Sequence, residues 1–199
     1  MGIHFAMDYL TEQGEYLNGE IEKPSISAEG KNVIVIGAGD TGADCVATAL
    51  RENCKSIVQF NKYTKQPEAI EFDENTYWPL AMPVFKMDYA HNEYEARFGF
   101  EPRAYGVQTM RYEVDRIGNV TGVYTQILEE TEDGMVVVDG TERHWPADLV
   151  LLSIGFIGTE TTVPHAFNIQ TERNKIVADN KNFKTCLLYT SPSPRDKRQ

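Results

Sequence analysis

The segment at residues 32–51 constrains the fold of this chain more than any other. Apolar, β-branched residues at positions 33–36 predict a buried strand, and an alanine-rich pattern at positions 43–51 predicts a helix. A loop with three glycines lies between them, and a second strand pattern follows the helix at positions 56–60. A strand, a glycine loop, a helix and another strand, in this order, are typical of the βαβ unit that binds the diphosphate of a dinucleotide.

Each glycine of the loop has its own use in such a unit. Gly37 lets the chain turn sharply off the strand, Gly39 lets a pyrophosphate approach the backbone, and Gly42 lets the helix pack close to the strand. The N-terminus of the helix presents free N–H groups to an anion. We therefore expect residues 37–42, with Ala38 among them, to bind a dinucleotide. A tight strand-to-helix turn without a ligand is the alternative.

Two polar residues of the loop each have two interpretations. The carboxylate of Asp40 would repel a pyrophosphate that it faced, so we expect it to cap backbone N–H groups or to hold the loop from outside. Thr41 could donate its hydroxyl to a phosphate oxygen. Both residues are also good helix starters, and the sequence does not separate these interpretations.

The end of the second strand bears on the choice of nicotinamide cofactor. The acidic residue that binds the ribose 2′-hydroxyl usually follows the loop by about 20 residues. Here that position falls near Asn61, and neither Asp nor Glu stands there. Asn61 could hydrogen-bond a 2′-hydroxyl, and Lys62, with Lys65 close by, could meet a 2′-phosphate as a point charge. Two solvated lysines without a ligand are the alternative.

Composition and charge exclude several classes of function. The net charge of −11 argues against binding to nucleic acid, because phosphate contacts need patches of Lys and Arg. No apolar run approaches the roughly 20 residues that cross a bilayer, and no secretory leader is visible. The 3 cysteines and 4 histidines lack the spacing of metal ligands, so we expect no metal site. Few cysteines suit a reducing compartment, the cytoplasm or, as the alternative, an organelle.

The remaining segments predict the other elements of the fold. We expect an amphipathic helix at 1–10, a connection at 18–31, an aromatic-rich excursion at 61–105 with a short helix near 91–98, an antiparallel meander at 107–114, 120–129 and 135–138, a buried strand at 147–156, and a hairpin at 169–178. A nearly continuous apolar strand suits a parallel sheet that is covered on both faces. Together these elements predict an α/β fold, a Rossmann-like three-layer domain with a central parallel sheet and an antiparallel meander.

Residues 186–199 differ in composition from the rest of the chain. Prolines, serines and basic residues replace the acidic, globular pattern, and residues 186–196 match the translation of a transposon-type sequencing adapter. We therefore expect this tail to be a sequencing artefact, and the chain to be a truncated fragment whose gene is cut near Thr185. A genuine disordered tail is the alternative.

Four segments in the same order resemble one known family. The segments are residues 37–45 (GAGDTGADC), 2–10 (GIHFAMDYL), 77–79 (YWP) and 147–156 (ADLVLLSIGF). The chain resembles the glutamate synthase small (beta) subunit, and the resemblance covers nearly all of residues 2–185. It implies a flavoprotein of the pyridine-nucleotide–disulfide-oxidoreductase fold, in which an NAD(P)H-binding domain interrupts an FAD-binding domain.

The resemblance also implies an activity, cofactors and a partner. In the family, NAD(P)H reduces FAD, and electrons pass through iron–sulfur clusters to a large (alpha) subunit, or a fused equivalent, that makes glutamate from glutamine and 2-oxoglutarate. Residues 1–30 would be a linker and helix from the preceding FAD domain, 31–155 the NAD(P)H-binding domain, and 156–185 the start of the return into the FAD domain. The first FAD loop and the cysteine clusters of the family are absent, so we expect no catalysis by the fragment alone.

Within this framework no catalytic residue is expected, because hydride transfer from nicotinamide to flavin needs no protein acid or base. Gly155 is a candidate for close approach to the nicotinamide half, with a plain turn glycine as the alternative. We expect NADH slightly more than NADPH, because the arginine pair of related NADPH-using subunits is missing near Asn61. Another FAD/iron–sulfur reductase and a non-catalytic nucleotide-sensing domain are the competing hypotheses.

Overall fold

The computed structural model describes residues 1–69, 84–131, 134–173 and 175–178, and it divides into two compact units, Met1–Ile154 and Gly155–Gln199. The elements of the first unit are β1 (Ile3–Phe5), α1 (Ala6–Leu17), β2 (Asn32–Ile36), α2 (Asp40–Arg51), β3 (Ser56–Phe60), α3 (Tyr89–Phe98), β4 (Arg103–Ala104), β5 (Val107–Val114), β6 (Val120–Thr131), β7 (Gly134–Val137), β8 (Arg143–Pro146) and β9 (Leu149–Leu152).

A parallel sheet forms the centre of this unit. Its five strands lie in the order β1-β9-β2-β3-β4, and each neighbouring pair is parallel. Ile34 in β2 pairs with Val58 on one side and with Val150 on the other. The central strands are apolar on both faces, as a sheet that is covered on both sides requires.

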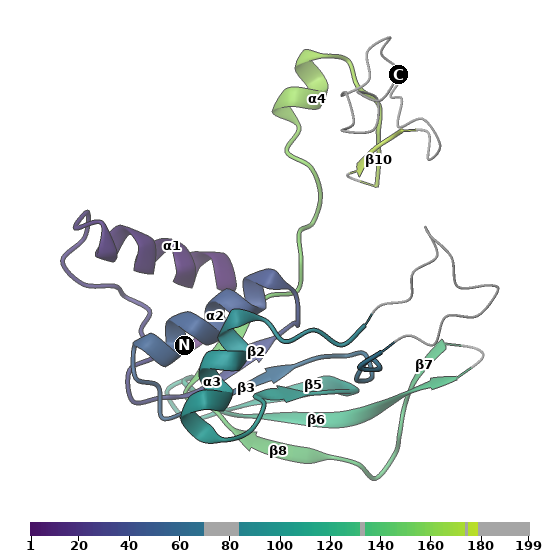
Figure 1. Cartoon of the computed structure of the whole chain (residues 1–199). Coiled ribbons are helices and arrows are strands. Elements are labelled where there is room, and N and C mark those ends of the chain that lie inside the picture. Colours follow the sequence, from purple (N-terminus) through teal and green to yellow (C-terminus); the bar gives the residue numbers. More distant parts are fainter. Residues whose placement is uncertain (70–83, 132–133, 174, 179–199) are drawn as a thin grey trace. The chain divides into compact units, whose positions relative to one another are not determined.

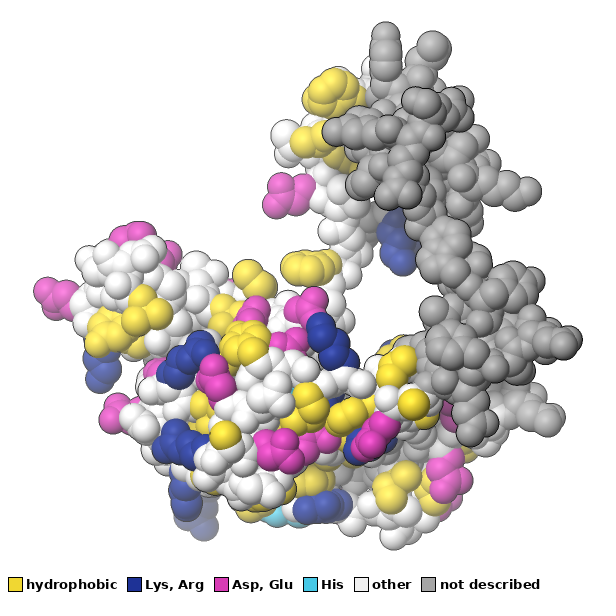
Figure 2. Space-filling model, in the orientation of Figure 1, with side chains coloured by type: hydrophobic (Ala, Val, Ile, Leu, Met, Phe, Trp, Pro, Cys, Tyr) yellow, Lys and Arg dark blue, Asp and Glu magenta, His cyan; other side chains and the backbone are white. Residues whose placement is uncertain are grey.

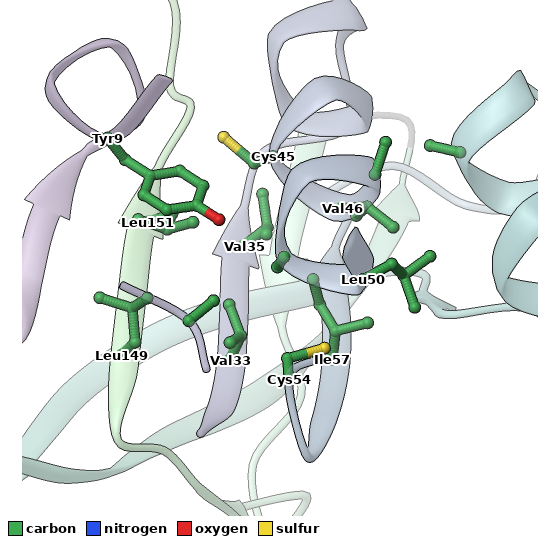
Figure 3. Close-up of a cluster of buried hydrophobic side chains, with 14 of the residues drawn as sticks. Tyr9, Val33, Val35, Cys45, Val46, Leu50, Cys54, Ile57, Leu149 and Leu151 are labelled. Atoms are coloured by element: carbon green, nitrogen blue, oxygen red, sulfur yellow. The ribbon is translucent and has the colours of Figure 1, made fainter. Parts of the chain in front are cut away.

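The two faces of the sheet are covered by different layers (Figure 1). On one face, α1, α2 and α3 bury a core that includes Val33, Val35 and Ile57 of the sheet (Figure 3). On the other face, Ile34 and Val150 pack with Val120, Val123 and Ala147 from the antiparallel sheet and its neighbourhood. The predicted α/β fold of three layers is therefore confirmed.

The helix that follows the glycine loop owes its place to small and apolar side chains. Ala43, Val46, Ala47 and Leu50 are spaced at three and four residues and are all buried. The short side chains let α2 approach the sheet closely. Cys45 on the same helix is fully buried, and burial raises the pKa of its thiol to about 12.

Two expectations about local structure were wrong. Residues 3–5 form strand β1 rather than the start of a helix, because they pair in parallel with β9 at the sheet edge. Strand β1 and helix α1 lie in one compact unit with residues 31–154. Helix α2 begins at Asp40 rather than at Ala43.

The antiparallel sheet also has one strand more than expected. Strands β5, β6 and β7 form the predicted meander, and β8 pairs with β6 beside them, so the sheet has four strands. The polar sequence of β8 concealed it, because three of its four residues are exposed. The predicted buried strand at 147–156 is shorter, since β9 ends at Leu152.

The second unit contains α4 (Thr162–Ala166), β10 (Thr171–Glu172) and β11 (Lys175–Ile176). β10 and β11 are antiparallel, which confirms the predicted hairpin. Arg173, at the turn between the two strands, has a positive φ of 48°. The proposed adapter tail at 186–199 and the Tyr-Trp-Pro segment at 77–79 lie outside the described residues.

Candidate functional site

A cavity of about 480 Å³ lies at the carboxyl ends of β2, β3 and β9. This end of a parallel sheet is where α/β folds bind their ligands. The glycine loop, the residues after β3, the start of β5 and the residues after β9 surround it. The lining residues are Ile36, Gly37, Ala38, Gly39, Phe60, Asn61, Lys62, Tyr63, Val107, Gln108, Thr109, Ser153 and Ile154. The structure thus brings together two parts of the predicted site, residues 37–39 and 61–62.

Each glycine of the loop occupies a distinct steric position. Gly37 has a φ of 119°, and a β-carbon there would lie 2.0 Å from the carbonyl oxygen of Ser153. A β-carbon at Gly42 would lie 2.4 Å from the carbonyl oxygen of Gly37. Gly39 lines the cavity, and no heavy atom lies within 4 Å of the position that its β-carbon would take. The protein therefore fills the space at Gly37 and Gly42 and leaves it open at Gly39, as a cradle for phosphate requires.

The start of α2 faces this open space with backbone donors. Gly39 is the N-cap, and no side chain caps the helix. The first N–H groups of a helix have no carbonyl partner within it, so the amides of Asp40 and Thr41 are available to an anion. Of the interpretations of Asp40, capping of N–H groups was wrong, because Gly39 is the N-cap and no side chain caps the helix; the other two are not excluded. Asp40 lies in the first turn of α2, where a carboxylate interacts favourably with the positive end of the helix dipole.

A smaller cavity of about 180 Å³ adjoins the first and shares Ala38, Gly39 and Asn61 with it. Asp40 lines only this smaller cavity. Thr41 and Gly42 are absent from the linings of both, so among the described residues the predicted hydroxyl donor Thr41 stands outside these cavities.

Asn61 and Lys62 lie where the second strand ends, as expected. The side-chain oxygen of Asn61 accepts a hydrogen bond of 3.0 Å from the N–H of Tyr63, which orients its amide NH₂ as a donor. Lys62 is exposed, and its ammonium lies 4.9 Å from the centre of the Tyr63 ring. Lys65 forms an ion pair of 3.7 Å with Glu68.

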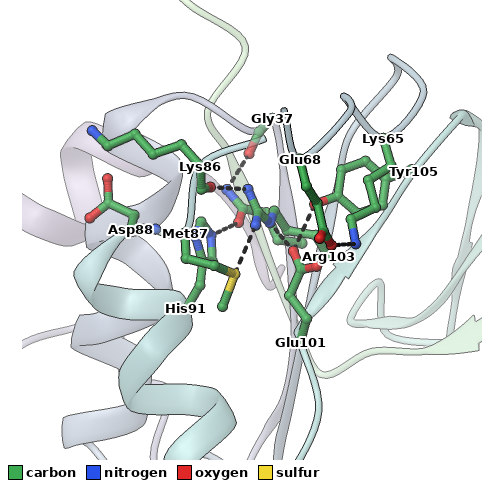
Figure 4. Close-up of polar contacts among 11 residues, drawn as sticks. Gly37, Lys65, Glu68, Lys86, Met87, Asp88, His91, Glu101, Arg103 and Tyr105 are labelled. Carbon is green, nitrogen blue, oxygen red and sulfur yellow. Dashed lines mark hydrogen bonds and ion pairs between the residues drawn. The ribbon is translucent and has the colours of Figure 1, made fainter. Parts of the chain in front are cut away.

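Arg103 is a cationic residue of the smaller cavity that sequence reasoning missed. Its guanidinium forms an ion pair with Glu101, donates to the carbonyl oxygen of Lys86 at 3.0 Å and contacts the sulfur of Met87 at 3.2 Å (Figure 4). These contacts engage three of the five N–H donors of the guanidinium within the protein. Nothing in the sequence marked Arg103, because its two-residue strand β4 lies within residues 61–105, which the sequence predicts as an excursion far from the glycine loop.

Sequence reasoning also missed a series of hydrogen bonds between buried polar groups. Gln59 in β3 is fully buried, and its Nε2 donates to the carbonyl oxygen of Gly37 at 2.9 Å. Its Oε1 lies 2.7 Å from Nε2 of His91 in α3. Nδ1 of His91 accepts a hydrogen bond of 3.2 Å from the N–H of Asp88, the N-cap of α3. Figure 4 labels Gly37, His91 and Asp88 of these hydrogen bonds, close to Arg103.

The buried imidazole of His91 is neutral at ordinary pH. Burial lowers the pKa of His91 to about 4, and the nearby Arg103 adds to this effect, while Glu101 and Asp88 oppose it. Because Nδ1 accepts a hydrogen bond from the backbone N–H of Asp88, the proton of the neutral ring is on Nε2. Nε2–H therefore donates to Gln59.

The last predicted site residue, Gly155, belongs to the second unit. It has a φ of 85°, and a β-carbon there would meet no heavy atom within 4 Å. The cavity lining ends one residue before it, at Ile154.

The surface bears on the excluded classes of function. On the face shown in Figure 2, acidic side chains are interspersed among the basic ones over the described residues. Among those residues, no helix combines the length and apolar character that a membrane crossing requires. Within the same part of the chain, no group of three or more His, Cys, Asp or Glu side chains is placed to hold a metal ion.

Comparison with known proteins finds glutamate synthases among the relatives of this chain. No protein-family profile matches the chain. The glutamate synthase [NADPH] small chain of Bacillus subtilis is 44% identical over 191 residues, which cover 92% of this chain and 38% of that protein. The glutamate synthase [NADH] of Schizosaccharomyces pombe is 37% identical over 194 residues, 94% of this chain and 9% of that protein. The chain therefore spans less than half the length of these relatives.

Among solved structures, Mycobacterium tuberculosis FprA in complex with NADPH is similar with a TM-score of 0.48 and 16% identity, over 80% of this chain and 46% of that one. The sequence relatives confirm the resemblance that the four segments indicated. Over most of its length, the chain is similar to part of the glutamate synthase small chains.

Proposed function

We propose that this chain is the NAD(P)H-binding part of a flavoprotein oxidoreductase. In the whole protein, electrons would pass from NAD(P)H through FAD and iron–sulfur clusters for the synthesis of glutamate from glutamine and 2-oxoglutarate. The observation that carries the proposal is the cavity at the carboxyl ends of β2, β3 and β9, where Gly39 is open and the start of α2 supplies backbone donors. Similarity to glutamate synthases supports the choice of reaction.

The residues present fit a dinucleotide. The amides of residues 38–41 would hold the diphosphate, and the Asn61 amide would donate to the adenosine ribose. When bound, the reduced nicotinamide supplies a hydride for the flavin. Gly155 is our candidate for close approach to the nicotinamide half. The chain's own part is to bind and orient the dinucleotide, so no side chain is assigned an acid or base role.

We further propose NADH as the slightly preferred cofactor. A 2′-phosphate is best recognised by arginines, and residues 61–69 contain none. Lys65 is paired with Glu68, and the charge of Arg103 is balanced by its ion pair with Glu101. Lys62 is the basic residue of the cavity lining that remains to meet a phosphate.

The proposal extends to domains, partner and location. Residues 31–155 would be the NAD(P)H-binding domain, joined by β1 and α1, and 156–185 the start of the return into the FAD domain. FAD and iron–sulfur clusters would be held mainly by parts of the whole protein beyond this chain. The partner would be a glutamate synthase large (alpha) subunit or a fused equivalent, since both small chains and longer single proteins are among the relatives. The few cysteines support the cytoplasm or an organelle.

Anaerobic mixing of the full-length protein with NADH or NADPH tests this function. We expect the yellow flavin absorbance to bleach, and glutamate to form from glutamine and 2-oxoglutarate when the large subunit is present. Flavin reduction without glutamate formation would favour another FAD/iron–sulfur reductase. Dinucleotide binding to a protein without flavin would favour a nucleotide-sensing domain.

A further inference from the structure

The orientation of one peptide bond decides whether the glycine loop can bind phosphate. In a trans peptide the carbonyl and the N–H point in opposite directions. The carbonyl of Gly37 points into the protein, where it accepts the hydrogen bond from Gln59. The N–H of the same peptide belongs to Ala38, an exposed residue that lines both cavities. The inward carbonyl therefore turns the Ala38 N–H outward, to the side of the cavities.

We propose that Gln59 and His91 are positioning residues for the dinucleotide, which hold the Gly37–Ala38 peptide with its N–H toward the phosphate cradle. The inference rests on the proposed nucleotide binding and adds two buried residues to it. Without the Gln59 donor, the Gly37–Ala38 peptide loses its inward hydrogen bond, and a rotated peptide would present a carbonyl oxygen to the phosphate.

His91 matters because the side-chain amide of Gln59 can rotate and exchange the positions of its oxygen and nitrogen. Rotated by half a turn, Gln59 would place its oxygen against the carbonyl oxygen of Gly37, and two acceptors would face each other. The Nε2–H of His91 holds the Gln59 oxygen on its own side at 2.7 Å. The N–H of Asp88 fixes the proton of His91 on that nitrogen. Each link thus sets the direction of the next, from the start of α3 to the loop.

The surroundings of the hydrogen bonds between Gly37, Gln59 and His91 leave these groups little freedom to move. Gln59 and His91 are 0% and 3% exposed, so water does not substitute for a lost partner. The N–H of Gly37 donates to the carbonyl oxygen of Phe60 at 3.0 Å, which fixes the preceding peptide. A β-carbon at Gly42 would lie 2.6 Å from Nε2 of Gln59, so α2 closes over the bond. The Gly37–Ala38 peptide is consequently held by a side chain in addition to the backbone.

The test compares dissociation constants of NADH and NADPH for the full-length protein and its variants. Gln59→Met removes the donor with little change of length, and we expect binding to weaken roughly tenfold to hundredfold, the effect of one lost or reversed hydrogen bond to a charged ligand. Gln13→Met is the matched control. Gln13 is a buried amide of α1 that donates to the carbonyl oxygen of Ile26 at 3.2 Å, so a similar loss of stability is expected with unchanged binding.

Two variants of His91 provide a rescue experiment. His91→Gln keeps an N–H donor for Gln59, whereas His91→Leu removes it, so we expect binding by His91→Gln to stay close to wild type and binding by His91→Leu to weaken. Equal binding by the two, or unchanged binding by Gln59→Met, would overturn the positioning role. If Gln59→Met fails to fold, the His91 pair decides alone. Absence of binding to the wild type would instead refute the proposed function itself.

Discussion

Gly37 and Ser153, on the loops that follow β2 and β9, lie so close that a β-carbon on Gly37 would come within 2.0 Å of the Ser153 carbonyl oxygen. The N–H of Ser153 in turn donates to the carbonyl oxygen of Ile36 at 2.8 Å. The turn off β2 is therefore fixed by its neighbour β9 as well as by its own sequence. Gly39, two residues on, has no such neighbour.

This difference predicts opposite behaviour of two alanine variants. Gly37→Ala should destabilise the protein by roughly 3 kcal/mol or more, because it combines a positive φ with a clash against backbone. Gly39→Ala should change stability by less than about 1 kcal/mol, because its φ is −83° and space is open. It should nevertheless weaken NAD(P)H binding, since the methyl group would occupy the cradle. Urea unfolding and dinucleotide titration measure both effects, and equal stability of the two variants would contradict the geometry.

The buried imidazole of His91 predicts a dependence of stability on pH. The pKa of His91 is about 4 in the folded protein and 6.5 in the unfolded chain, so its contribution is fully present above pH 6.5 and is lost as the pH falls toward 4. Between pH 7.5 and 4.5 the loss should be about 2 kcal/mol. The difference in free energy of unfolding between wild type and His91→Gln isolates this part from the carboxylates. An identical acid response of the two proteins would show that His91 titrates normally.

We expect Glu52, at the C-terminal end of α2, to anchor α1 and the loop that follows α1. Its carboxylate accepts hydrogen bonds from the Tyr9 hydroxyl, Gln13, Ser27 and the N–H of Ala28. Burial and this carboxylate raise the pKa of Tyr9. Glu52→Ala should destabilise the protein on the order of 2 kcal/mol or more, because buried donors lose their acceptor.

Glu93→Ala is the control for Glu52, since Glu93 forms an exposed ion pair with Arg51 and should contribute less than about 1 kcal/mol. Thermal unfolding of both variants measures the difference. A Glu52 variant as stable as the Glu93 variant would mean that the four hydrogen bonds do not anchor α1.

The variant Lys62→Ala tests the proposed preference for NADH over NADPH. With NADH as the cofactor, Lys62→Ala should change NADH affinity little, because an exposed lysine has no 2′-phosphate to meet. Titration of wild type and variant with both dinucleotides measures this. A clear wild-type preference for NADPH that disappears in Lys62→Ala would reverse the proposed preference.

The glycine loop could be predicted from the sequence because its determinants are local. Small residues at 37, 39 and 42, a β-branched strand before them and an alanine-rich helix after them are adjacent in the chain. Asn61 could be placed for the same reason, since the distance from the loop to the end of the next strand varies little in such units.

The parts that could not be predicted depend on contacts between distant segments. Ile3–Phe5 lies within the segment 1–10 that has the pattern of an amphipathic helix. It forms a strand because the edge of β9 offers backbone partners about 150 residues away. Gln59 looks like an ordinary polar position in a strand, and its bond to His91 depends on how α3 returns to the sheet. The predicted capping role of Asp40 was wrong, because Gly39 is the N-cap of α2.

Isothermal titration calorimetry of the full-length protein with NADH and with NADPH tests the central claim most directly, namely that the backbone at residues 37–41 binds the diphosphate of a nicotinamide dinucleotide. We predict saturable heat with one dinucleotide per chain, and a weaker affinity in Gly39→Ala. The absence of heat with both dinucleotides, from a correctly folded protein, would contradict the claim.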